Sequence, residues 1–61
     1  MIIFVDDEGF VMNFNLSGPM LKYTLRQADA QDFDTRTQAM HVVKVNEIPV
    51  DKVSLLQYNN T

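Results

Sequence analysis

The chain lacks the residues that usually support very small domains. It has 61 residues with no Cys, no Trp and one His. Without cysteine it can form neither a disulfide nor a thiolate zinc site. A chain of this length buries roughly 60% of its surface on folding. We therefore expect residues 1–61 to form a single domain with one thin core, and no walled pocket for a small-molecule substrate.

Positive charge is also scarce. Five Lys and Arg stand against eight Asp and Glu, which gives a formal net charge of −3. The basic residues are Lys22, Arg26, Arg36, Lys44 and Lys52. They are spread along the chain, whereas a protein that follows a phosphate backbone needs several cations on one face. The composition therefore argues against a nucleic-acid partner.

Long hydrophobic runs are missing as well. The N-terminal apolar run ends at Val5 and is followed at once by Asp6 and Asp7, so it is too short for a signal sequence. No apolar stretch approaches the ~20 residues that span a bilayer. A hydrophobic content of 46% with a small net charge is not typical of disordered chains. We expect a soluble cytoplasmic protein with no membrane contact.

The first sixteen residues carry the clearest structural pattern. Two apolar runs, at about 2–5 and 10–16, flank the letters D-D-E-G and predict a β-hairpin. A type I turn with Gly9 in the left-handed conformation pairs residues whose numbers sum to 16. Ile2 and Phe4 then share one face with the even-numbered apolar residues of the second strand.

The other face of the predicted hairpin is also apolar near the turn. It carries Ile3, Val5 and Val11, and a strand that is apolar on both faces is usually covered on both sides. A chain this short cannot cover both faces well. Ile3, Val5 and Val11 are therefore predicted to bind a partner, which is either another copy or a larger protein.

The remaining elements are less clear. Residues 19–30 are rich in helix formers and predict a middle helix, but Leu21, Tyr23 and Leu25 also alternate as in a strand. A capping box at Thr35-x-x-Gln38 predicts a short helical turn. A strand is expected at about 41–46, and a short helix or an edge strand at about 50–58. The predicted fold class is α+β, with an all-β meander as the alternative.

The polar residues offer few candidate chemistries. Asp6, Asp7 and Glu8 form a dense acidic turn that is a candidate for partner binding, although acidic residues and Gly are also common in turns for backbone reasons. The acids of the loop after residue 28 lack the spacing, the Gly and the distant Glu of a calcium loop. A single His cannot assemble a zinc site, and no G-x-S-x-G elbow exists. We predict no catalytic, cofactor or metal residues.

Two segments carry a family resemblance. The opening I-I-F-V-D-D-E-G-F-V and the later V-K-V-N-E-I-P-V-D resemble the layout of short bacteriophage accessory proteins encoded among tail or baseplate genes. The resemblance implies a virion structural or host-interacting role without catalytic residues. The protein would then reside in the virion or in the host cytoplasm.

These observations lead to one main functional hypothesis. The chain is predicted to be a non-enzymatic protein–protein interaction module that self-associates as a homo-oligomer or docks on a larger assembly. One alternative is a small viral or bacterial inhibitor that blocks a host enzyme and presents the acidic turn to a basic site. A second alternative is a minimal metal-binding protein.

Overall fold

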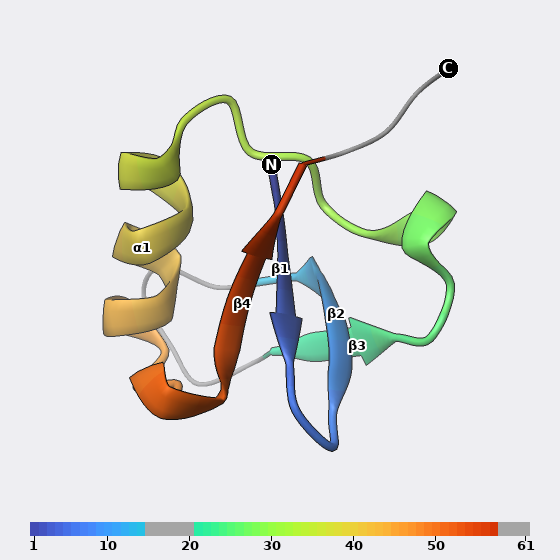
Figure 1. The fold of residues 1–61 in the computed structure, drawn as a ribbon, viewed down its shortest axis with the longest axis horizontal. Coiled ribbons are helices and arrows are strands. Elements are labelled where there is room, and N and C mark those ends of the chain that lie inside the picture. The colour runs from blue at the N-terminus through green and yellow to red at the C-terminus, as the bar shows by residue number, and fades with distance from the viewer. Residues whose placement is uncertain (15–20, 58–61) are drawn as a thin grey trace.

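A computed structural model describes residues 1–14 and 21–57. Within these residues, four strands form one antiparallel sheet in the order β3-β2-β1-β4, with the helix α1 beside it (Figure 1). The elements are β1 (Ile2–Val5), β2 (Gly9–Asn13), β3 (Lys22–Thr24), η1 (Gln27–Asp29), α1 (Arg36–Val45), η2 (Val50–Lys52) and β4 (Val53–Leu56). The α+β class predicted from the sequence is therefore correct.

The N-terminal hairpin is present, but its register differs from the prediction. β1 pairs with β2 through Phe4↔Phe10 and Val5↔Gly9, so paired residue numbers sum to 14 rather than 16. The amide of Glu8 donates to the carbonyl of Val5 at 3.0 Å and closes the turn. Asp7 takes the positive φ of 68° inside this turn, a conformation that Asp tolerates better than most residues. The last two residues of the predicted second strand, 15 and 16, lie outside the described residues.

Gly9 is required by the neighbouring strand as well as by its backbone angle. Its φ is 115°, which L side chains rarely adopt. A Cβ atom on Gly9 would lie 2.7 Å from the carbonyl oxygen of Thr24 in β3. The glycine therefore allows β3 to approach the start of β2 closely.

A β-bulge in β2 changes which side chains face the core. Val11 pairs with Tyr23, but Asn13 pairs with Lys22, so Met12 is an extra residue on the β2 side. The extra residue reverses the alternation of side chains beyond it, so that Phe14 packs against the core.

The middle segment forms the strand β3 at Lys22–Thr24. The helix predicted at 19–30 is therefore wrong in the part of this range that the structure describes.

The loop before α1 bonds to the middle of β2 and to the residue that precedes β1. The amide of Gln31 donates to the carbonyl of Val11 at 2.9 Å. Phe33 donates its amide to the carbonyl of Met1 at 2.7 Å and accepts from the N-terminal ammonium at 2.9 Å. These backbone bonds bring the Phe33 side chain into the core, where it is buried.

The helix α1 begins at the predicted capping box. The hydroxyl of Thr35 accepts from the amide of Gln38 at 3.1 Å, and the Gln38 side chain accepts from the amide of Asp34 at 3.2 Å. The helix continues for ten residues and buries Ala39, Val42 and Val43. The strand predicted at 41–46 is therefore wrong, because burial of this stripe outweighs the β-propensity of its valines.

The helix ends in a Schellman motif. The amide of Ile48 donates to the carbonyl of Val43 at 3.0 Å, and the amide of Glu47 donates to that of Lys44 at 3.1 Å. Glu47 occupies the left-handed position with a φ of 55°, where Gly is the usual residue. The motif turns the chain so that Ile48 is buried in the core.

The chain then returns to the sheet along β1. β4 pairs with β1 through Ile2↔Leu56, Ile3↔Leu55, Phe4↔Ser54 and Val5↔Val53. Residues 50–58 were expected to form either a short helix or an edge strand. The edge strand is correct for residues 53–56, which follow the short η2 turn. Residue 58 lies outside the described residues.

We expect Gly9→Ala to destabilise the protein by about 2 kcal/mol, because the new Cβ meets the Thr24 carbonyl and the positive φ becomes strained. Urea unfolding followed by circular dichroism measures the change. Asp7→Gly is the matched control in the same turn and should not destabilise. Equal stability of Gly9→Ala and the parent would contradict the close approach of β3.

We expect Glu47→Gly to stabilise the protein by roughly 0.5–1 kcal/mol, because Gly adopts the left-handed conformation without the steric penalty of a Cβ. Thermal or urea unfolding measures this gain. Glu47→Ala removes the same charge but keeps the Cβ, so it should give little or no gain. A gain of the same size in both variants would assign the effect to charge instead.

Candidate functional site

The three apolar residues predicted to bind a partner lie in the core. Ile3 and Val11 are fully buried, and Val5 is 2% exposed. They pack in one cluster with the helix residues Val42 and Val43. The prediction that Ile3, Val5 and Val11 form an exposed partner surface is therefore wrong: α1 covers the face of the sheet to which they belong.

The other face of the sheet carries several partly exposed apolar residues. Because paired residues in a sheet lie on the same side, the register places Phe4 with Phe10 and Ser54, and Ile2 with Leu56. The rings of Phe4 and Phe10 meet edge to face with centroids 5.0 Å apart. We call this side, opposite α1, the open face.

Exposure is greatest at the borders of the open face. Met12 is 39% exposed and Leu56 is 40% exposed. Phe4 and Phe10 are half-buried, and Ile2 at the centre is buried. Lys22 is the one charged residue within the four described strands. The open face is therefore a mixed surface with a single charged residue in its strands, on which partly exposed apolar side chains lie beside Asn13, Thr24 and Ser54.

The acidic turn projects from the end of the β1–β2 hairpin. Asp6, Asp7 and Glu8 are all exposed. The ion pairs among the described residues are those of the N-terminal ammonium with Asp32 and of Arg26 with Asp29, so none of them includes this turn. The turn is exposed, and its binding to a partner stays a prediction; it is separate from the predicted apolar residues, which are buried.

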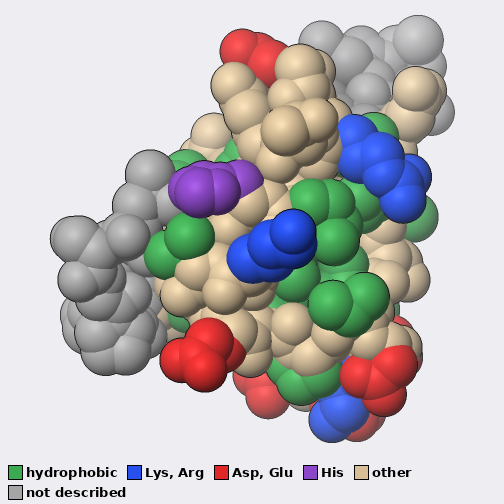
Figure 2. Space-filling model, turned by 90° about the vertical axis from the view of Figure 1, so that its left-hand side faces the viewer, with side chains coloured by type: hydrophobic (Ala, Val, Ile, Leu, Met, Phe, Trp, Pro, Cys, Tyr) green, Lys and Arg blue, Asp and Glu red, His purple; other side chains and the backbone are tan. Residues whose placement is uncertain are grey.

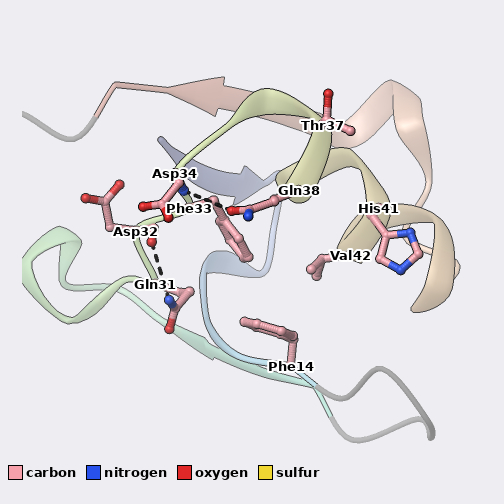
Figure 3. Close-up of a pocket in the computed structure, with 9 residues that line it drawn as sticks. All are labelled: Phe14, Gln31, Asp32, Phe33, Asp34, Thr37, Gln38, His41 and Val42. Atoms are coloured by element: carbon pink, nitrogen blue, oxygen red, sulfur yellow. Dashed lines mark hydrogen bonds between the residues drawn. The ribbon is translucent and has the colours of Figure 1, made fainter.

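A groove opens between α1 and the loop before it, with a volume of about 670 Å³. Figure 3 shows Phe14, Phe33 and Val42 facing one another across it, with Thr37 pointing away. The two phenylalanine rings are 5.3 Å apart. Its other described lining residues are Gln31, Asp32, Asp34, Gln38 and His41. The groove has an apolar floor and a polar rim.

The groove does not bring the predicted loop acids together as a metal site. Asp32 is held by the N-terminal ammonium, and Asp29 pairs with Arg26. Among residues 1–14 and 21–57, no three His, Asp or Glu side chains are close enough to hold a metal ion. His41 is exposed on the helix, whereas Ser54 lies on the open face of the sheet.

The outer side of α1 is a mixed surface. Figure 2 shows the single His and well-separated Lys and Arg side chains among apolar ones. Arg36, His41 and Lys44 are the exposed basic residues of this helix. The cations do not form a continuous patch on this side.

No protein-family model, curated protein or solved structure matches the chain. Within the part of the chain that the structure describes, no helix is long and apolar enough to cross a membrane.

Tyr23 gives the hairpin region a pH dependence. Partial burial of the phenol raises its pKa above the ordinary value of 10.0, and the nearby Glu8 carboxylate raises it further. The folded state thus favours the neutral phenol. The stability that this preference contributes is fully present below pH 10 and is lost as pH rises through the folded-state pKa.

We expect the free energy of unfolding to fall more steeply above pH 10 in the parent than in Tyr23→Phe. Urea unfolding at a series of pH values measures the free energy of unfolding of both proteins. Because both contain the same lysines, the contribution of lysine titration cancels in the difference between them. In a Tyr58→Phe background, absorbance titration should show that Glu8→Gln lowers the pKa of Tyr23. An unchanged pKa in that variant would contradict the influence of the Glu8 carboxylate.

Proposed function

We propose that the chain is a non-enzymatic protein–protein interaction module that self-associates or docks on a larger protein assembly. The observation that supports this proposal is the open face, where apolar side chains remain partly exposed opposite the single described helix. The surface proposed for contact is the open face, because Ile3, Val5 and Val11 are buried in the core.

The energetics favour burial of this face. Covering an exposed Leu, Met or Phe side chain contributes roughly 1.5–3 kcal/mol. The open face offers Met12 and Leu56, together with the half-buried Phe4–Phe10 pair. A domain of this length has a total stability of only about 3–9 kcal/mol, so contact with a partner contributes on the same scale as folding itself.

The sequence resemblance supports one candidate for the larger assembly. A virion accessory role in a bacteriophage tail or baseplate is one form of the proposal, because such subunits act by contact and need no catalytic site. In this form the open face would be buried against neighbouring subunits of the particle.

The acidic turn supports a second candidate function. Asp6, Asp7 and Glu8 are exposed together at the hairpin tip and suit a basic surface, as an inhibitor of a host enzyme would require. In this case, replacing all three by Lys should abolish capture of the partner. The open-face proposal instead predicts that capture survives this change.

We expect a photo-crosslinker at position 10 to report the partner directly. Replacing Phe10 by p-benzoylphenylalanine keeps an aromatic group on the open face, and irradiation in the source cells should give discrete crosslinked products, either with another copy or with a larger protein. The matched control places the same group at Thr37, which is exposed on α1. It should give few such products.

Two results would contradict the proposal. One is equal crosslinking from positions 10 and 37, which would indicate random collisions. The other is the absence of any discrete product from position 10 in a variant that circular dichroism shows to be folded.

A further inference from the structure

The two edges of the sheet differ in how they are protected. β3 is a three-residue strand that carries Lys22 and lies beside the bulge in β2. Short length, Lys and bulges are the devices that keep an edge strand from pairing with another chain. β4 carries neither Lys nor a bulge: its four residues are Val-Ser-Leu-Leu, followed by the uncharged Gln57.

The alternation of hydrogen-bonded pairs between β1 and β4 shows which backbone groups of β4 point away from β1. The amide of Asp6 donates to the carbonyl of Lys52 at 2.9 Å, so this pair is hydrogen-bonded. Hydrogen-bonded pairs alternate along an antiparallel ladder, and Ser54 and Leu56 therefore bond to β1. The N–H and C=O of Leu55 point away from β1, toward the free edge.

The side chains along this edge suit a second copy of the same strand. In an antiparallel pair centred on Leu55, that residue faces its own equivalent, Val53 faces Gln57, and Ser54 faces Leu56. None of the residues 53–57 is charged, so no like charges oppose each other even though each copy carries a net charge of −3. The pairing is self-complementary, as a two-fold interface requires.

We propose that β4 pairs antiparallel with β4 of a second copy, with Leu55 on the two-fold axis exchanging both backbone hydrogen bonds with its equivalent. This rests on the proposed function and specifies how copies associate. The result is a continuous eight-stranded sheet. Because Ser54 and Leu56 both lie on the open face, the open faces of the two copies merge into one surface.

The sharpest test removes one outward N–H and leaves the side chain in place. Chemical synthesis can supply the 61-residue chain with N-methyl-Leu55. Because this N–H points away from β1, circular dichroism should show an intact fold. Sedimentation equilibrium should show that the dimer Kd rises about 30-fold or more, since both symmetric hydrogen bonds are lost.

A matched control places the same modification on the other edge. The Phe10↔Thr24 pair is hydrogen-bonded by the same alternation, so the N–H of Tyr23 points away from β2. A folded N-methyl-Tyr23 chain should dimerise with the Kd of the parent. A parent that stays monomeric at about 1 mM overturns the edge pairing, because affinities weaker than this are not specific associations.

The register has a separate test. Mixing Ser54→Cys with Leu56→Cys should give a mixed disulfide between copies in preference to either homodimer, because each of these positions faces the other and neither faces its own equivalent. Random disulfide exchange would overturn the proposed register.

The same measurements separate this inference from the proposed function. If Phe10→Ser abolishes the dimer while N-methyl-Leu55 leaves it intact, copies associate through the open face, and the edge pairing is overturned while the interaction module stands. If N-methyl-Leu55 abolishes the dimer and position 10 still crosslinks to another protein, both are supported.

Discussion

The packing of α1 against one side of β1 is the contact on which the rest of the structure depends. β1 lies between β2 and β4, and its odd-numbered residues, Ile3 and Val5, meet the buried stripe of the helix. The single described helix can cover only one face of a four-stranded sheet. Because α1 covers the side that carries Ile3 and Val5, Phe4 and the residues paired with it lie on the opposite side. This opposite side is the open face, which remains available for contact.

The sequence predicts the strands of this hairpin and their two faces, but not which face is inside. Ile3 and Val5 are as apolar as Ile2 and Phe4, so hydrophobicity alone cannot rank the two sides of β1. The deciding contact is with Val42 and Val43, forty residues away in the chain. Because those valines are β-branched, local propensity predicted a strand for them, and the helix that would have ranked the faces was missed.

Other features were visible only in part. The capping box at Thr35 identified the start of α1, because that signal is local. The bulge at Met12 and the positive φ of Asp7 were not predicted, since each depends on how β3 and the turn meet. Leu25 and Leu56 were also missed as surface residues, because their exposure depends on the register of β3 and β4 and not on their own neighbours in sequence.

In β1, Ile3 belongs to the core beneath α1 whereas Phe4 is partly exposed on the opposite face, and neighbouring charge substitutions test this arrangement most directly. Urea unfolding should show that Ile3→Glu has no stable folded state. The free-energy cost of burying an unpaired carboxylate exceeds the total stability of the domain, which is about 3–9 kcal/mol. Phe4→Glu should remain folded with only a modest loss. The reverse order, or two equally damaging substitutions, would contradict this arrangement of core and surface.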